Sequence, residues 1–246
     1  MATQLPRPMF FLVILIALSA SAASTTSTTS ISSERVRVDY YYEALCPGCA
    51  DFLVNSLSKI FTNQLISIIN LHLVPYGNAR LGGPDKKTII CQHGAKECFL
   101  NTVEGCAIHV WDDVNKHFPF IRCMEEFLMT RKVTTGWESC FEETGLDPKP
   151  VKDCYNGPRG YKVQMRYAKE MGNLTPHPQF VPWVVVDGKP LREDYVNFMV
   201  YVCNAYKGTP VPQACKTLPL QFTAEKDENN KVQQLCYRED PGRSEQ

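Results

Sequence analysis

The chain has 246 residues, of which 26 are basic (Lys or Arg) and 26 acidic (Asp or Glu), so its formal net charge is zero. A chain of this length can bury a sizeable core, either as one large domain or as a domain with an insertion. The balanced charge gives no electrostatic reason to expect nucleic acid or an anionic membrane as a partner.

The N-terminal segment reads as a targeting signal followed by a leader. A basic residue, an apolar run and a group of small residues follow one another between Arg7 and Ala23. This order is typical of a secretory signal peptide, and we predict one at residues 1–23. The apolar run is too short to span about 30 Å of hydrocarbon, and no other run in the chain is long enough, so we expect no membrane span in the mature protein. Residues 24–34 are rich in Ser and Thr and predict a disordered leader.

The cysteines agree with a secretory route. Eleven cysteines in an oxidising compartment imply a disulfide framework. Because the number is odd, at least one thiol is free, removed with a processed segment, or shared between chains, which leaves a disulfide-linked dimer open. No KDEL-like signal closes the sequence, so we expect the protein to travel onward to a lysosome, a vacuole or the cell exterior. Asn173 begins the one glycosylation sequon, Asn-Leu-Thr.

A Cys-x-x-Cys motif, Cys46-Pro47-Gly48-Cys49, stands between a predicted strand and a predicted helix. Apolar residues alternate over 36–44, recur at helical spacing over 50–61, and indicate a second strand over 66–75. Strand, helix and strand in this length predict a βαβ unit with parallel strands. Cys46 would lie just outside the helix N-terminus and Cys49 in the first turn, which favours a thiolate at Cys46.

A cysteine-rich helical insertion is predicted at about residues 84–178. Apolar stripes, prolines and glycines indicate one helix around 99–110, a second opened by Pro119, a third between 147 and 157, and a fourth over 161–171. Its six cysteines are interpreted mainly as structural staples, with a connectivity that the sequence does not reveal. On an unbroken helix Cys98 and Cys106 would be about 12 Å apart, too far to pair with each other.

Strand character returns before the C-terminal region. A hydrophobic run over 181–186 followed by Asp-Gly signals a hairpin, and Asp194 can cap a helix that ends at Gly208. Cys203 and Cys215 flank a proline-containing loop, where we favour a local disulfide. The predicted domain therefore covers residues 35–208, and residues 209–246 are expected to form a C-terminal tail that is partly disordered or processed.

This order of elements resembles the thioredoxin superfamily, an α/β fold. In that superfamily a cis-proline precedes the third strand and faces the two redox cysteines. Pro182, preceded by Val181, has that position, and the resemblance implies that this pair shapes the substrate site. An ordinary trans proline at a strand start is the alternative.

A more specific resemblance lies inside the insertion. The sequence fits the pattern C-Q-H-G-x2-E-C-x2-N-x4-C at every defined position, namely Cys91, Gln92, His93, Gly94, Glu97, Cys98, Asn101 and Cys106. This is the signature of the gamma-interferon-inducible lysosomal thiol reductase (GILT) family, and the resemblance covers roughly residues 35–215. It implies a thioredoxin-like fold with a cysteine-rich helical insertion. It also implies a soluble glycoprotein of an acidic, lysosome-like compartment that reduces disulfides of protein or peptide substrates and is processed at both ends.

The expected mechanism has two steps. Cys46, as a thiolate, attacks a substrate disulfide, and Cys49 then attacks the mixed disulfide and releases the reduced substrate. No bound cofactor and no metal are expected, but an external thiol reductant must restore the dithiol. Pro47 and Gly48 help to set the redox potential. His93 is a candidate cation near the thiolate if the insertion folds over the site; a capping or buried, hydrogen-bonded role is the alternative.

Three other functions compete with this one. Cys46 and Cys49 could be half of a zinc site, although no second Cys-x-x-Cys exists. Every cysteine could be a staple in a non-catalytic secreted binding protein, although a disulfide between residues three apart closes too small a loop to stabilise much. A protein with the same fold could also form or rearrange disulfides instead of reducing them, as an oxidase or isomerase.

Overall fold

The computed structural model describes Met1 and residues 35–222 and 234–238. The predicted signal peptide and leader, and the tail residues 223–233 and 239–246, lie outside the described residues. Among the helices of the described ranges, none is long and apolar enough to cross a membrane.

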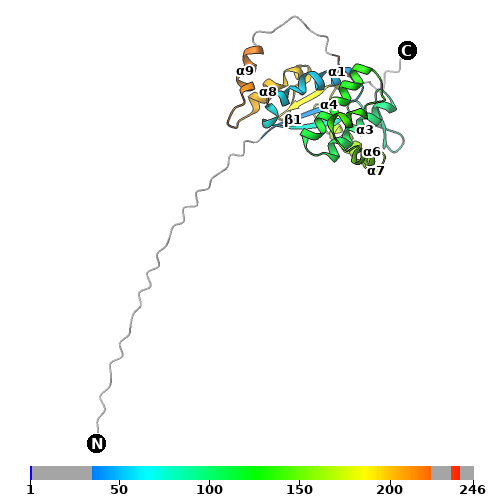
Figure 1. Ribbon diagram of the computed structural model, residues 1–246, viewed down its shortest axis with the longest axis horizontal. Helices are drawn as coiled ribbons and strands as arrows, with labels where there is room; N and C mark the ends of the chain where they lie inside the picture. Colours follow the sequence, from blue (N-terminus) through cyan, green and yellow to red (C-terminus); the bar gives the residue numbers. More distant parts are fainter. Residues whose placement is uncertain (2–34, 223–233, 239–246) are drawn as a thin grey trace. The chain divides into compact units, whose positions relative to one another are not determined.

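A four-stranded sheet forms the centre of the fold (Figure 1). Strand β1 (Val36–Tyr42) pairs in parallel with β2 (Ile69–Pro75), as the predicted βαβ unit requires. On its other side β1 pairs antiparallel with β6 (Trp183–Val186), which turns into β7 (Lys189–Pro190). The predicted hairpin after Val186 is therefore present, and the sheet order is β2-β1-β6-β7.

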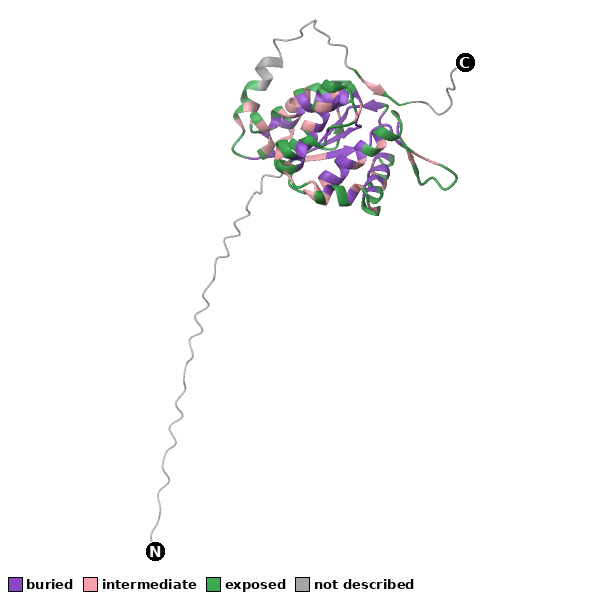
Figure 2. Cartoon of the chain, turned by 45° about the vertical axis from the view of Figure 1, so that its right-hand side comes forward, coloured by how far each residue is buried: buried purple, intermediate pink, exposed green. Residues whose placement is uncertain are grey.

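Strand β1 is buried on both of its faces, apart from Arg37 (Figure 2). The alternation in the sequence predicts one face more buried than the other. In the structure both faces of β1 are buried because helices contact each of them. Tyr40 donates a hydrogen bond to the carbonyl of Cys49 (2.9 Å), and Tyr41 donates one to Glu170 (3.2 Å). A tyrosine can occupy such a position because its ring is apolar while its hydroxyl finds a partner.

The crossover between β1 and β2 is less regular than predicted. Helix α1 (Pro47–Phe52) passes into a π-helical turn, η1 (Leu53–Leu57), and then into α2 (Lys59–Thr62) and a 3-10 turn, η2 (Leu65–Ile68). In the π-helical turn the N–H of Ser58 donates to the carbonyl of Leu53 at 3.1 Å, five residues earlier. The predicted single amphipathic helix is thus three consecutive pieces.

The insertion begins with a short hairpin that the sequence does not predict, β3 (Arg80–Gly82) with β4 (Thr88–Ile90). Five helices follow: α3 (Ala95–Val110), α4 (Val114–Arg131), α5 (Ser139–Thr144), α6 (Lys149–Tyr155) and α7 (Pro158–Gly172). Helix α4 does not open at Pro119. Asp113 caps it by accepting a hydrogen bond from the N–H of Asn115 (2.9 Å), and Pro119 lies inside the helix.

Four disulfides stabilise the body of the molecule. Cys91–Cys98 closes the loop that enters α3, Cys106–Cys154 joins α3 to α6, Cys123–Cys140 joins α4 to α5, and Cys203–Cys215 joins α8 (Phe198–Ala205) to α9 (Gln213–Phe222). Cys98 and Cys106 lie on the unbroken helix α3 and do not pair, in agreement with the distance argument. The local disulfide that the sequence favours near the C-terminal loop is present.

The C-terminal region differs from the prediction in two places. The helix expected from Asp194 to Gly208 is a 3-10 helix, η3 (Arg192–Asn197), followed by α8. The predicted tail contains a further helix, α9, and a two-residue strand, β8 (Cys236–Tyr237). Strand β8 pairs with β5 (Phe180–Val181), so part of the tail packs against the domain.

Candidate active site

The Cys-x-x-Cys motif lies where β1 ends and the chain turns into α1. Leu45 has a left-handed backbone (φ +71°), and Cys46 is the N-cap residue of α1, with Pro47 as the first helical residue. The N–H of Ala50 donates to the carbonyl of Cys46 at 3.0 Å, which places Cys49 in the first turn. Both cysteine side chains are buried. The motif therefore has the strand–turn–helix setting that the sequence predicts.

Cys46 is bonded to a cysteine outside the motif. Its disulfide partner is Cys236 of β8, 190 residues further along the chain, with a Cα–Cα distance of 6.1 Å. All eleven cysteines lie in the described part of the chain, and Cys49 is the free one. The expected Cys46–Cys49 bond is thus not the one formed in the structure, because the tail supplies the partner.

The Cys49 thiol is held in its neutral form. Complete burial raises its pKa well above the usual value, and the nearby carboxyls of Glu43 and Glu125 raise it further. Such a sulfur is a poor nucleophile until a disulfide is presented to it and its proton is removed. This suits a resolving thiol better than an attacking one.

Pro182 lies next to the motif, as the resemblance implies. The Val181–Pro182 peptide bond is cis, and the carbonyl oxygen of Val181 lies 3.9 Å from the Sγ of Cys46. Strand β5, which ends at Val181, and helix α1 therefore bring these residues together although 135 positions separate them in sequence.

The pattern from Cys91 to Cys106 forms the support of the site rather than a separate subdomain. Glu97 is fully buried, and its Oε2 accepts from the N–H of His93 and pairs with His93 Nδ1, both at 2.7 Å. Gly94 has φ +81°, a conformation that favours glycine.

One turn further on, Asn101 accepts a hydrogen bond from the N–H of Ala44 (2.8 Å), two residues before Cys46. The pattern thus connects α3 to the loop that carries the nucleophile.

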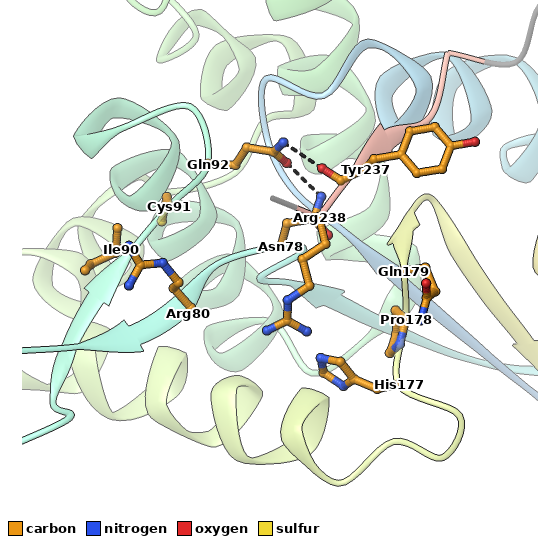
Figure 3. Close-up of a pocket in the computed structure, with 10 residues that line it drawn as sticks. All are labelled: Asn78, Arg80, Ile90, Cys91, Gln92, His177, Pro178, Gln179, Tyr237 and Arg238. Carbon is orange, nitrogen blue, oxygen red and sulfur yellow. Dashed lines mark hydrogen bonds between the residues drawn. The ribbon is translucent and has the colours of Figure 1, made fainter. Parts of the chain in front are cut away.

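Asn78 and Gln92 hold the tail strand by its backbone (Figure 3). Asn78 Nδ2 donates to Oε1 of Gln92 at 2.7 Å, and Gln92 Nε2 donates to the carbonyl of Tyr237 at 2.8 Å. Asn78 Nδ2 also donates to the carbonyl of Cys236 at 2.8 Å. Asn78 is fixed in turn by Glu43, whose Oε2 accepts from the Asn78 N–H (2.6 Å). One signature residue therefore touches the segment bonded to Cys46.

Comparison with known proteins decides the family. The family described as "Gamma interferon inducible lysosomal thiol reductase (GILT)" matches residues 37–144. The gamma-interferon-responsive lysosomal thiol protein of Arabidopsis thaliana is 43% identical over 190 residues, which are 76% of this chain and 78% of that protein. The gamma-interferon-inducible lysosomal thiol reductase of Mus musculus is 36% identical over 192 residues, or 76% and 74% of the two chains. The chain belongs to the GILT family.

Solved structures agree on the fold. The reduced form of the disulfide bond oxidoreductase DsbG from Mycobacterium tuberculosis has a TM-score of 0.51 at 16% identity, covering 77% of this chain and 86% of that one. Oxidised BdbD from Bacillus subtilis has a TM-score of 0.50 at 14% identity, covering 70% and 88%. This GILT-family chain is therefore a thiol-disulfide oxidoreductase with a thioredoxin-like fold and a helical insertion. The non-catalytic alternative is set aside.

Several buried carboxyls surround the GILT-family site. Burial raises the pKa of Glu43 to about 8, with a smaller contribution from Glu97, whose own pKa is raised by burial. Deeper in the core, Glu104 accepts a hydrogen bond from Tyr42 (2.6 Å) and pairs with Glu125. Burial raises the pKa of Glu104 to about 7 and that of Glu125 well above its ordinary value. At acidic pH Glu43 and Glu104 are therefore neutral, which is the form a buried site tolerates.

His93 lies beside the tail cysteine. One of its ring nitrogens, a carboxylate oxygen of Glu43 and the Sγ of Cys236 all lie within 4.8 Å of one another. The ring is partly exposed and is oriented by Glu97. The insertion therefore does fold over the site, as the cation hypothesis for His93 requires.

The remaining sequence-predicted positions lie away from this chemistry. Asn173, the sequon residue, is exposed at the C-cap of α7, where a glycan has access. In the form that the structure shows, Cys46 is in a disulfide and is not available to zinc, which is bound by thiolates.

Sequence reasoning missed Cys236, Asn78 and Glu43. The odd number of cysteines indicates only that one thiol lacks a partner, and in the structure that thiol is Cys49, so no local signal pointed to Cys236. Asn78 and Glu43 belong to no motif, and only the fold brings them to the site.

Proposed function

We propose that this enzyme reduces disulfide bonds of protein or peptide substrates through Cys46 and Cys49. One observation carries the proposal: Cys46 is joined to a cysteine from outside the motif, while Cys49 stays free and buried three residues away. This is the composition of a mixed disulfide, in which one cysteine of the motif holds the partner and the other is ready to resolve it.

The proposed cycle begins with the Cys46 thiolate. Its sulfur attacks one sulfur of the substrate disulfide, and the other substrate sulfur leaves as a thiolate that takes up a proton. Cys49 then loses its proton and attacks Cys46, which releases the second substrate thiol and leaves a Cys46–Cys49 disulfide. A small thiol outside the protein supplies the two electrons that restore the dithiol, so the protein itself needs no bound cofactor or metal.

We place this activity in an acidic compartment of the secretory pathway. The relatives named above are lysosomal by name, and the buried carboxyls around the site are best accommodated in their neutral forms. Signal-peptide cleavage, a glycan on Asn173 and removal of residues at either end belong to the same proposal. At pH 5 a thiol with an ordinary pKa near 8.5 is only about 0.03% thiolate, so Cys46 must have a lowered pKa to react there.

The reduction potential of the Cys46–Cys49 couple distinguishes a disulfide reductase from a disulfide oxidase that uses the same two cysteines. The experiment determines the reduction potential of Cys46 and Cys49 in the Cys236→Ser full chain, and follows insulin reduction at pH 5 and pH 7. We expect a reducing couple, turnover with excess thiol, and loss of turnover in Cys46→Ser. A potential near that of strong oxidants, about −120 mV, would assign the enzyme to disulfide formation or isomerisation instead.

A further inference from the structure

The segment Gln234–Arg238 lies in the active site as an extended strand. Its residues Cys236 and Tyr237 pair antiparallel with Val181 and Phe180 of β5, and the N–H of Arg238 donates to the carbonyl of Gln179 at 2.9 Å. A strand added to an exposed edge is a general mode of peptide recognition, because the backbone supplies the hydrogen bonds. The site therefore already contains a bound peptide, and that peptide is part of the chain.

The contacts from the insertion are also made to the backbone of this segment. Asn78 donates to the carbonyl of Cys236 and Gln92 to that of Tyr237. Gln92 and Asn78 are hydrogen-bonded to each other, so the two amides are fixed relative to the strand. Because every residue offers a backbone carbonyl, these two amides fit any extended segment with a cysteine at this position.

The room for the segment is provided by Gly48. A Cβ added to Gly48 would lie 1.6 Å from the carbonyl oxygen of Gln234, far closer than non-bonded atoms approach. On the other side of the cysteine, the ring of Tyr237 packs against that of Phe180 with centroids 5.8 Å apart. Arg238 borders a cavity of about 560 Å³ (Figure 3). The site thus contacts the segment both before Cys236, at Gln234, and after it, at Tyr237 and Arg238.

We propose that segment 234–238 is a covalently bound self-substrate, and that Asn78 and Gln92 bind the matching carbonyls of a substrate cysteine and of the residue after it. The preferred substrates are disulfide-bonded cysteines in extended segments, with an aromatic residue following the cysteine to meet Phe180. The inference rests on the proposed function, whose substrate class it names.

The self-substrate can leave by the chemistry of the site. Cys49, after losing its proton, attacks the Sγ of Cys46; the Cys46–Cys236 bond breaks, its electron pair stays on Cys236, and that sulfur takes up a proton. A Cys46–Cys49 disulfide forms, so there is no net oxidation, and an external thiol then reduces it. Release of the tail by exchange with Cys49, followed by reduction of the Cys46–Cys49 disulfide, therefore precedes the first turnover.

The first test traps the bound tail. In full-length Cys49→Ser, the resolving thiol is absent, so the Cys46–Cys236 disulfide should persist under mild oxidation and be found by mass spectrometry of alkylated, digested protein. Gly48→Ala in the same background should lower the amount of this disulfide, because the added methyl meets Gln234. Recovery of Cys236 as the alkylated thiol, or bonded to another cysteine, would overturn the proposal.

The second test asks whether the tail contacts serve substrates. In the Cys236→Ser background, Gln92→Ala should raise the KM for a disulfide-bonded Leu-Cys-Tyr-Arg peptide by about threefold to tenfold, the range of one lost hydrogen bond, with little change in kcat. Asn78→Ala should behave similarly. Hydroxyethyl disulfide has no peptide carbonyl, so its reduction should stay unchanged. Gln213→Ala, an exposed glutamine at the start of α9, is the matched control.

The two substrates separate the two proposals. If Cys236→Ser reduces neither the peptide nor hydroxyethyl disulfide, the proposed function fails. If it reduces both, and Gln92→Ala changes both KM values equally or neither, only the self-substrate proposal fails.

Discussion

The side-chain oxygen of Asn101 accepts a hydrogen bond from the backbone N–H of Ala44 across 2.8 Å, and both residues are buried. Ala44 lies two residues before Cys46, in the turn that follows β1. Asn101 is itself held in place, because its backbone carbonyl accepts from Gln164 (2.8 Å) and its side-chain nitrogen donates to Glu97 (3.4 Å). The asparagine of the GILT signature therefore positions the nucleophile through one backbone atom.

We expect Asn101→Ala to destabilise the protein and to slow it. The N–H of Ala44 would be buried without a partner, which costs about 1–3 kcal/mol in the free energy of unfolding. Urea unfolding measures this loss, and the alkylation rate of Cys46 in Cys236→Ser protein reports the displaced turn. Asn55→Ala is the control, since Asn55 bonds Asp51 on the exposed side of the molecule. Equal stabilities of the two variants would contradict the assigned role.

The disulfides of the insertion should differ in their contributions to stability. Cys106–Cys154 closes a loop with a sequence separation of 48, whereas Cys91–Cys98 has a separation of 7. The chain-entropy relation gives about 4 kcal/mol for the longer loop and about 2.4 kcal/mol for the shorter one. Thermal unfolding of the two double-serine variants at equal pH measures the difference. A larger loss from Cys91–Cys98 would show that native contacts in the signature loop, rather than loop closure, dominate.

The local parts of this fold are predictable because short-range patterns determine them. The strand β1, the tight Cys-x-x-Cys turn and the Asp-Gly hairpin each depend on a few neighbouring residues, and the structure has all three, although β1 is buried on both faces rather than on one. Helix boundaries are less predictable. Pro119 suggests a helix start, yet α4 begins at Val114, because the cap that Asp113 provides can offset the one backbone donor that Pro119 lacks.

The long-range parts cannot be predicted in the same way. The bond between Cys46 and Cys236 joins residues 190 positions apart, and no local pattern links them. The amide pair of Asn78 and Gln92 depends on how the β3–β4 hairpin and α3 are placed against β1, which is a matter of packing. The resemblance to the GILT family supplied the signature residues, but the structure was needed to give Asn101 and Gln92 their separate contacts.

The buried pair Glu104 and Glu125 should make the protein more stable at acidic pH than at neutral pH. Burial raises the pKa of Glu104 in the folded state to about 7, above the ordinary value of 4.5. Well below pH 4.5 both the folded and the unfolded state are protonated, and the stability is complete. As the pH rises toward 7 the unfolded state loses its proton first, so the stability falls, by about 3 kcal/mol for Glu104 alone.

Urea unfolding between pH 4.5 and pH 7.5 measures this dependence. Glu104→Gln keeps the shape and the neutral charge of the protonated carboxyl, so its stability should vary less with pH than that of the wild type. Glu126→Gln is the control, because Glu126 is exposed on the same helix as Glu125. A pH dependence that Glu104→Gln leaves unchanged would assign the effect to other groups, with Glu43 the first to examine.

His93 should favour the thiolate of Cys46 once the tail is released. Its ring lies within 4.8 Å of the sulfur that is bonded to Cys46, and Glu97 holds it there. A protonated imidazole at this place stabilises a neighbouring thiolate, so His93→Gln in the Cys236→Ser background should raise the pKa of Cys46 by about half a unit to one unit. The pH profile of iodoacetamide alkylation measures the shift. His109→Gln, which changes an exposed histidine in the last turn of α3, should leave the profile in place. If the pKa of Cys46 is the same in His93→Gln as in the parent protein, His93 has a structural role only.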